Sequence, residues 1–313
     1  MRPRTHTPET LAGGGPAFAC SDPPAPLEAA AIDAPILLAL QEDRGGGDVT
    51  SETVLDREAR ARGRLVAKAP GRLAGVGVFA RTFELCDPEV RVECLAQDGA
   101  AVVPGDVLVR LEGRAWALLT AERTALNFVQ RMSGIATLTA AYVERAAGGA
   151  RILDTRKTTP GLRLFEKYAV RCGGGENHRF GLFDEAMLKD NHLDLAGRGL
   201  GELVAQVRRT VGPGVRITAE ARDRAEALAA AAGGADVVLL DNLDAGTMAR
   251  LCPEVREAAL RGAGRAVEIE ASGGIDLQNV GAVAACGVDR ISVGALTHSA
   301  PALDLSLTLE PVP

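Results

Sequence analysis

From Arg151 onward the sequence alternates short apolar runs with Ala-rich, charged stretches, and this alternation constrains the fold more than any other feature. Charged stretches such as 223–232 have helical character, and strands that alternate with helices favour a parallel sheet. Six such units in about 150 residues predict a closed or nearly closed α/β barrel of about six to seven strands. The expected strands are Ile152–Asp154, Ala186–Leu188, Val215–Ala219, Val237–Leu240, Val267–Ile269 and Arg290–Val293.

A charged or flexible polar element follows each expected strand at its carboxyl end. In α/β barrels this end bears the loops that form the active site, so these elements should converge. For any single element, a loop charge or a helix cap is an equally good explanation, and Asp241-Asn242 could cap the next helix. For all six together that explanation is much weaker. The elements are Arg156-Lys157, Lys189-Asp190, Glu220, Asp241-Asn242, Ser272-Gly273-Gly274 and Gly294.

The charge distribution indicates a small anionic ligand. Residues 151–179 contain seven Lys/Arg and three Asp/Glu, a local balance of +4, whereas the whole chain has a net charge of −6. A cationic centre in an acidic protein favours an anionic ligand over nucleic acid. Only 3% of the residues are aromatic, which argues against stacking on single-stranded nucleic acid. We therefore expect no nucleic-acid partner.

The residue types at the strand ends indicate the chemistry. Lysine and arginine bind anions, and the arginine fork matches carboxylates and phosphates. Ser272-Gly273-Gly274 and Gly294 follow the last two strands, where α/β barrels commonly bind phosphate through backbone N–H groups. Glu220 and Asp241 could bind ribose hydroxyls, hold Mg²⁺ or stabilise developing positive charge. Together these residues predict an enzyme for a phosphorylated, multiply anionic substrate, with Mg²⁺ as cofactor.

The part of the chain before Arg151 has a different sequence pattern. Residues 27–40 have the pattern of a helix, and residues 61–113 contain short β-type runs separated by turns, which predicts a small antiparallel sheet. Residues 115–147 predict a long helix, because apolar residues recur at near-helical spacing. Ser133-Gly134 is a plausible break in this helix.

The remaining features concern location. The Pro-, Gly- and Ala-rich residues 1–26 predict a disordered tail without a signal peptide. No apolar run approaches the ~20 residues needed to cross a bilayer, so no membrane partner is expected. The six cysteines lack metal-ligand spacing and are expected to be reduced thiols of a cytoplasmic protein. Cys172, beside a triple glycine, is a weak candidate nucleophile because no base is evidently dedicated to it.

Several motifs resemble those of the quinolinate phosphoribosyltransferase family, the decarboxylating nicotinate-nucleotide pyrophosphorylases of NAD biosynthesis. The matching stretches run in family order from about Leu27 to the C-terminus. They are EDRGGGDVT at 42–50, LLTAERTALNFVQRMSGIAT at 118–137, DTRKTTPGLR at 154–163, KYAVRCGGGENHR at 167–179, LKDNH at 188–192, LLDN at 239–242, ASGG at 271–274 and VGALTHS at 293–299. The highly specific combination is DTRKTTPGLR followed by GGGENHR and KDNH.

The resemblance implies a reaction and a domain organisation. Quinolinate and 5-phosphoribosyl-1-pyrophosphate would give nicotinate mononucleotide, pyrophosphate and CO₂. The implied domains are an N-terminal α+β open-faced sandwich at 27–138, joined by the C-terminal segment 299–313, and the α/β barrel at 139–298. A homodimer, or a hexamer built from dimers, with active sites shared between subunits is also implied.

The resemblance assigns four cationic or polar residues to quinolinate. Arg156, His178 and Arg179 are similar to the family's clamp on the two carboxylates. Arg123 is similar to the arginine that the neighbouring subunit donates. A relative that acts on another base or cofactor precursor should lack part of this clamp, so that paralogous phosphoribosyltransferase is the alternative reading.

The other substrate, 5-phosphoribosyl-1-pyrophosphate, is assigned to the remaining strand-end residues. The implied catalytic residues are Glu220 and Asp241, which face the ribose and its Mg²⁺, with Lys157 and Lys189, which bind phosphates. Seven residues in all are implied to bind this substrate: Lys157, Lys189, Glu220, Asp241, Ser272, Gly273 and Gly294.

The chain departs from the family pattern at two positions. Thr218 stands where many relatives have a second Glu, and Ala271 stands where Ser is common, which leaves the fine tuning of the ribose pocket open. Two further classes are weaker explanations. Residues 99–113 resemble the hairpin of biotinyl or lipoyl carriers but have no lysine for attachment, and a silent regulatory subunit would not need the complete set of charged strand ends.

Overall fold

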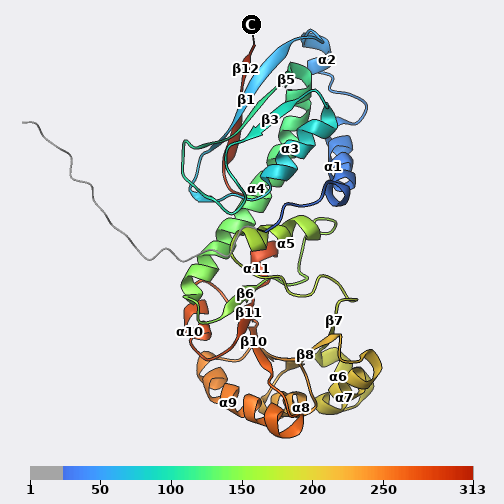
Figure 1. The fold of residues 1–313 in the computed structure, drawn as a ribbon, viewed down its shortest axis with the longest axis vertical. Helices are drawn as coiled ribbons and strands as arrows, with labels where there is room; N and C mark the ends of the chain where they lie inside the picture. Colours follow the sequence, from blue (N-terminus) through green and yellow to red (C-terminus); the bar gives the residue numbers. More distant parts are fainter. Residues whose placement is uncertain (1–23, 313) are drawn as a thin grey trace, which may run out of the picture.

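The computed structural model describes residues 24–312, and one long helix joins its two sheet-containing parts. Figure 1 shows an antiparallel sheet at the top and a parallel sheet at the bottom, with α4 (Ala115–Ala146) running from one to the other. The tail expected at 1–26 lies almost entirely outside the described residues. Within 24–312, no helix combines the length and the apolar character that a bilayer span requires.

The upper sheet is antiparallel, with strand order β12-β1-β5-β3. Its central strand β1 alternates exposed and buried residues, so one face packs against helices and the other faces solvent. This arrangement confirms the expected α+β open-faced sandwich. The strands are β1 (Arg60–Ala67), β3 (Arg91–Cys94), β5 (Val107–Arg114) and β12 (Leu305–Pro311), with a separate pair, β2 (Gly71–Arg72) and β4 (Ala101–Val102).

The edge strand β12 comes from the end of the chain. It pairs antiparallel with β1 from Ala61↔Pro311 to Ala67↔Leu305. The expected assignment of 299–313 to the N-terminal domain agrees with this pairing, although the domain limits themselves stay a prediction. The helix expected at 27–40 is present as α1 (Ala29–Arg44). Two further helices, α2 (Ser51–Val54) and α3 (Val76–Cys86), follow it.

The lower sheet has six parallel strands in the order β6-β11-β10-β9-β8-β7. All six expected strands are confirmed. They are β6 (Arg151–Leu153), β7 (Glu185–Leu188), β8 (Arg216–Ala221), β9 (Val237–Asp241), β10 (Glu268–Ser272) and β11 (Arg290–Ser292). An isolated bridge between Leu153 and Glu176 extends the pairing beyond β6, and no ladder joins β6 to β7 in the described chain.

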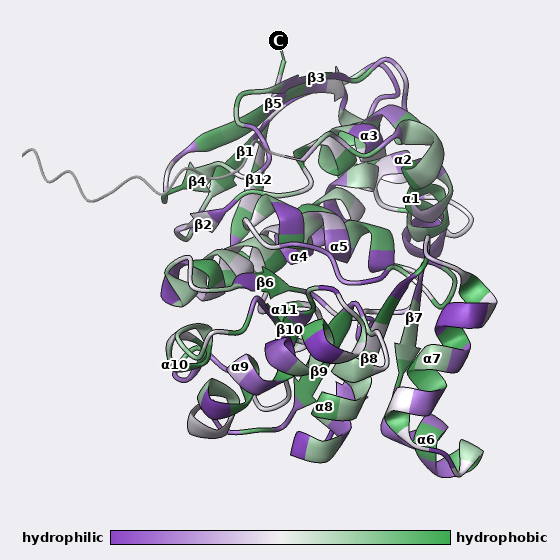
Figure 2. Ribbon diagram, turned by 60° about the horizontal axis from the view of Figure 1, so that its bottom comes forward, coloured by the Kyte–Doolittle hydropathy of each residue, from purple (hydrophilic) through white to green (hydrophobic). Residues whose placement is uncertain are grey.

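Helices cover the outside of this barrel-like sheet. Figure 2 shows mostly hydrophobic strands in the centre and helices that alternate between hydrophobic and hydrophilic residues around them. This is the pattern of parallel strands that are buried on both faces. The helices are α5 (Arg163–Cys172), α6 (Asp190–Ala196), α7 (Leu200–Val211), α8 (Arg224–Ala232), α9 (Ala245–Gly262), α10 (Val280–Ala284) and α11 (Ala295–His298).

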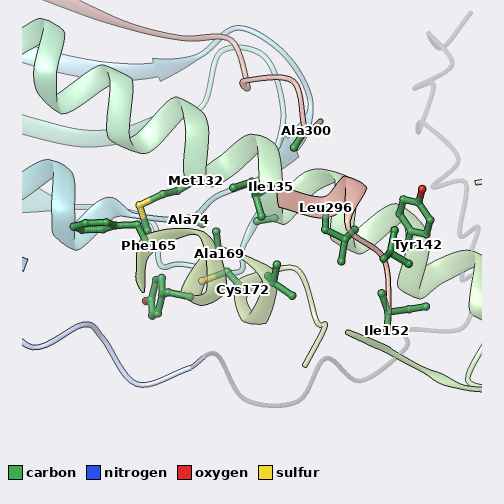
Figure 3. Packing of buried hydrophobic residues seen from close by; sticks show 14 of the residues in the cluster. Ala74, Met132, Ile135, Tyr142, Ile152, Phe165, Ala169, Cys172, Leu296 and Ala300 are labelled. Carbon is green, nitrogen blue, oxygen red and sulfur yellow. The ribbon is translucent and has the colours of Figure 1, made fainter. Parts of the chain in front are cut away.

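Helix α4 is continuous, so the break expected at Ser133-Gly134 is wrong. The Ser133 hydroxyl bonds both the N–H (3.0 Å) and the carbonyl (3.2 Å) of Ala74. Gly134 lies against the backbone of Pro301 and Ala302, where a side chain would not fit. These two small residues allow close helix packing and do not end the helix. Figure 3 shows the same stretch of α4, with Met132 and Ile135 in the buried cluster beside α5 and α11.

We predict that Gly134→Ala destabilises the protein. The new Cβ would overlap Pro301 O and lie 3.0 Å from Ala302 Cα, and such overpacking costs about 1–3 kcal/mol or more. Chemical denaturation should show this loss in the free energy of unfolding. Gly77→Ala is the control, because Gly77 is also helical but no described atom lies within 4 Å of its new Cβ. It should stabilise by about 0.5–1 kcal/mol. Equal stability of the two variants would contradict the packing argument.

Candidate active site

The carboxyl ends of the barrel strands surround a cavity of about 650 Å³. Parallel strands place these ends at one edge, which is why residues far apart in sequence meet there. Of the eleven expected site residues, all but Arg123 line the cavity: Arg156, Lys157, His178, Arg179, Lys189, Glu220, Asp241, Ser272, Gly273 and Gly294. Arg123 lies on α4, exposed to solvent and outside this cavity.

One end of the cavity is cationic. Burial and the nearby Arg156 both lower the pKa of Arg179, although Glu185 and Asp184 oppose this effect. Arg179 is oriented by a 3.2 Å hydrogen bond from its guanidinium to the carbonyl of Glu185. Two neighbouring guanidinium groups, one half-buried at Arg179 and one exposed at Arg156, are suited to an anion with more than one negative charge.

A buried network fixes the turn that precedes Arg179. Lys167 pairs with Asp154, and their side chains are 3% and 0% exposed. Lys167 Nζ also donates to the carbonyl of His178 at 2.9 Å, while Asp154 accepts from the N–H of His178 at 2.9 Å and from Asn177 Nδ2 at 2.6 Å. Burial raises the pKa of Asp154 and lowers the pKa of Lys167, and their mutual attraction opposes both shifts.

The ring of His178 is engaged at both nitrogens. Its Nδ1 accepts the N–H of Arg179 at 2.7 Å, so the ring proton of the neutral form lies on Nε2. Nε2 lies 3.4 Å from Glu270 Oε1, and Glu270 Oε2 accepts from Arg290 Nε at 2.6 Å. In this arrangement His178 borders the cavity and is held from behind by a buried ion pair.

Sequence reasoning missed Glu270 and Arg290. Glu270 is 0% exposed and lies in β10 between Ile269 and Ala271, and a charged residue between two apolar ones was the available signal. Burial would raise the pKa of its carboxyl, but the interaction with His178 and the charge of Arg290 outweigh burial and lower the pKa to about 2. Glu270 therefore stays ionised and needs both partners.

Another part of the cavity lining combines a lysine with two acids. Lys189 forms an ion pair with Glu220, whose side chain is 11% exposed. Asp241 accepts a 2.8 Å hydrogen bond from Asn242 Nδ2. The suggestion that Asp241-Asn242 caps the next helix is wrong, because Asp244 caps α9 by accepting the N–H of Thr247 at 2.9 Å. Asp241 is thus free of a capping role.

Two glycine positions border the expected phosphate site. Gly273 has φ +86°, and a Cβ there would collide with Asn242. A Cβ on Gly294 would lie 3.0 Å from Lys157 Cδ and 3.2 Å from His298 Nε2. Their backbone N–H groups donate to no acceptor within residues 24–312, so they are available to an anion.

The residues are compatible with Mg²⁺ that arrives with a substrate. The described residues contain no group of three or more His, Cys, Asp or Glu side chains that could hold a metal ion. Mg²⁺ is usually bound by one or two carboxylates plus substrate phosphates and keeps several waters. Glu220 and Asp241, which line the cavity from the neighbouring strands β8 and β9, fit that mode and not an all-protein metal cage.

The structure shows the surroundings of three residues whose roles the sequence left open. Thr218 is fully buried and donates its hydroxyl to the buried carboxylate of Glu185 on the neighbouring strand β7. Ala271 is fully buried in β10. Cys172 is 1% exposed and lies outside the cavity, and burial raises its pKa, so it is not a thiolate nucleophile.

We predict that Glu270 makes stability pH-dependent in acid. Its pKa is about 2 in the folded protein and about 4.3 in an unfolded chain. The resulting stabilisation, about 3 kcal/mol, is complete above about pH 4.5 and is lost as pH falls toward 2. Denaturant titrations should show that Glu270→Gln is less stable at pH 7 and that the difference shrinks by pH 3. A difference that is constant with pH would contradict the assigned charge state.

Comparison with known proteins identifies the family. Models of the N-terminal and C-terminal domains of quinolinate phosphoribosyl transferase match residues 48–133 and 135–308.

The chain is 42% identical to a probable nicotinate-nucleotide pyrophosphorylase (carboxylating) of Bacillus subtilis over 270 residues, covering 85% of this chain and 89% of that protein. An Archaeoglobus fulgidus protein of the same name is 45% identical over 264 residues, 83% of this chain and 97% of that one. The crystal structure of NadC from Streptococcus pyogenes superposes with a TM-score of 0.84 at 40% identity, covering 93% of this chain and 100% of that one. The chain therefore belongs to the quinolinate phosphoribosyltransferase family.

Proposed function

We propose that this protein transfers phosphoribosyl from 5-phosphoribosyl-1-pyrophosphate to quinolinate, giving nicotinate mononucleotide, pyrophosphate and CO₂ in NAD biosynthesis. The main support is the single cavity that ten of the eleven expected site residues line. Its arginines fit a dianion such as quinolinate, and its lysines, two acids and glycines fit a phosphorylated ribose.

The side chains have complementary roles in this proposal. Arg156 and Arg179, with His178 beside them, orient the ring nitrogen of quinolinate toward the anomeric carbon of the ribose. As pyrophosphate leaves, positive charge develops on the ribose, and Glu220 and Asp241 stabilise it. Lys157 and Lys189 bind phosphate oxygens, and the N–H groups at Gly273 and Gly294 hold the 5-phosphate with Ser272.

Decarboxylation needs little from the protein. The bond between ring carbon 2 and its carboxylate breaks, CO₂ leaves, and the electron pair stays at that carbon. The neighbouring ring nitrogen is positively charged after transfer and stabilises this pair until a proton replaces the lost group. The nicotinate ring then retains one carboxylate.

Mg²⁺ is part of the proposal as a cofactor. Glu220 and Asp241 would hold it together with oxygens of 5-phosphoribosyl-1-pyrophosphate. When bound, Mg²⁺ neutralises charge on the departing pyrophosphate. We also propose a cytoplasmic location, which the free thiols of Cys86, Cys94, Cys172, Cys252 and Cys286 support.

We further propose a homodimer, alone or within a hexamer, whose active sites are shared. The support is the position of Arg123, which is exposed on α4 and has no ion-pair partner in residues 24–312. A donated Arg123 would complete the quinolinate clamp of a second subunit. A paralogous phosphoribosyltransferase for another base is the alternative, but the chain retains Arg156, His178 and Arg179 in the cavity.

The direct test is an assay with 5-phosphoribosyl-1-pyrophosphate, Mg²⁺ and either quinolinate or nicotinate. We expect nicotinate mononucleotide and CO₂ from quinolinate only, because nicotinate lacks one of the two carboxylates that the clamp holds. Product from nicotinate would show that the clamp is misassigned. If neither acid gave product, the proposed acceptor would be wrong, and other ring acceptors should be tested.

A subunit-mixing experiment tests the shared site. Arg123→Ala should raise KM for quinolinate at least about tenfold, the effect of losing one charge-assisted contact, while the oligomer persists. Arg179→Ala should raise KM for quinolinate to a similar extent for the same reason, so both variants should have low activity at a quinolinate concentration near the KM of the unmodified protein. Mixing the two variants should restore activity, because some sites would then combine an intact Arg123 with an intact Arg179. Failure to restore activity in mixed oligomers would contradict sharing.

A further inference from the structure

Arg131 on α4 joins three segments of the chain although it lies outside the active-site cavity. Its Nε and one terminal nitrogen contact Glu166 Oε1 at 3.2 and 2.9 Å. The other terminal nitrogen donates to the carbonyl of Ala300 at 2.9 Å, and a further hydrogen bond reaches the carbonyl of Thr297. Every nitrogen of this guanidinium is therefore engaged.

The first route from Arg131 leads to the loop after β6. Glu166 on α5 is 1% exposed, and both its oxygens are used. Oε2 accepts the N–H of Thr159 at 3.0 Å, and Oε1 accepts the Thr159 hydroxyl at 2.8 Å. Thr159 belongs to the loop that presents Lys157 to the cavity, so Glu166 anchors this loop.

The second route leads to the turn after β11. The carbonyl of Thr297, on α11, accepts from Arg131, and the fully buried Thr297 hydroxyl donates to the carbonyl of Lys157 at 2.8 Å. The same turn contains Gly294, whose missing side chain leaves room for Lys157 Cδ. Both routes therefore end at Lys157.

The segments that Arg131 joins also pack against one another. Figure 3 shows Met132 of α4, Phe165 of α5, Leu296 of α11 and Ala300, which follows α11, in one apolar cluster. A carboxylate as buried as Glu166 is stable only if a cation and further hydrogen bonds compensate its lost hydration. Arginine can reach Glu166 and two carbonyls at once through its planar fork, which a lysine cannot do.

We propose that Arg131 and Glu166 are positioning residues that fix Lys157 and the Gly294 turn for 5-phosphoribosyl-1-pyrophosphate. The inference rests on the proposed function. The quinolinate end should depend less on this pair, because the separate Asp154–Lys167 network holds His178 and Arg179, and only Arg156 of the clamp lies in the loop that Glu166 anchors.

The test is the steady-state KM for each substrate. Arg131→Met should raise KM for 5-phosphoribosyl-1-pyrophosphate at least about tenfold, and KM for quinolinate less than about threefold. The matched control is Arg81→Met, which removes an ion pair with Asp33 at 2.8 Å, the arginine side chain being 31% exposed against 29% for Arg131. The control should leave both KM values unchanged.

A second pair of variants covers the case in which Arg131→Met does not fold. Thr297→Val removes the hydroxyl that donates to the carbonyl of Lys157 at 2.8 Å and to the carbonyl of Gly294 at 3.3 Å, and Thr297→Ser keeps this hydroxyl. The Val variant should raise KM for 5-phosphoribosyl-1-pyrophosphate selectively, and the Ser variant should behave like the unmodified protein. Equal increases in KM for both substrates, or no increase in KM, in the folded variants would overturn the positioning role of Arg131 and Glu166. The proposed function would then still stand. An inactive unmodified protein would instead overturn the proposed function and, with it, this inference.

Discussion

Three buried carboxylates behind the cavity each depend on one cation from another segment. Asp154 is paired with Lys167, Glu166 with Arg131, and Glu270 with Arg290. Removing any of these cations would leave an uncompensated buried charge, which is far more costly than losing a surface pair. The loops that present the cavity residues are thus held by interactions that tolerate little rearrangement, which is how short loops can place side chains for chemistry.

Charged side chains are paired differently at the two ends of the barrel. At the amino end, Arg151 pairs with Glu176 at 3.0 Å and with Glu268 at 2.6 Å, and Arg216 pairs with Glu268, so the charges there neutralise one another. At the cavity end, Arg156 has no acidic partner within 4.0 Å among the described residues. Cations without an acidic partner keep a local positive potential that attracts an anionic ligand.

Much of this site could be predicted from sequence because parallel strands obey a simple rule. Once the apolar runs were recognised, the polar residues after them had to meet at one edge, and the structure places Lys157 and Asp241 there together. Predictions from local sequence were wrong where tertiary contacts determine the local structure. Ser133-Gly134 suggests a helix break, but close packing against Ala74 and Pro301 keeps the helix intact. Arg131 and Glu166 have the spacing of ordinary helix surface residues, so only the packing of α4, α5 and α11 shows what they connect.

The position of β12 has a consequence for how the chain reaches this fold. Strand β1 at Arg60–Ala67 has β5 on one side and β12, at Leu305–Pro311, on the other. During synthesis the ribosome must produce the whole barrel before the upper sheet can acquire its last strand. Until then β1 has an unpaired edge, which is prone to pairing with other chains. A truncated product that lacks β12 would keep every cavity residue and still expose that edge.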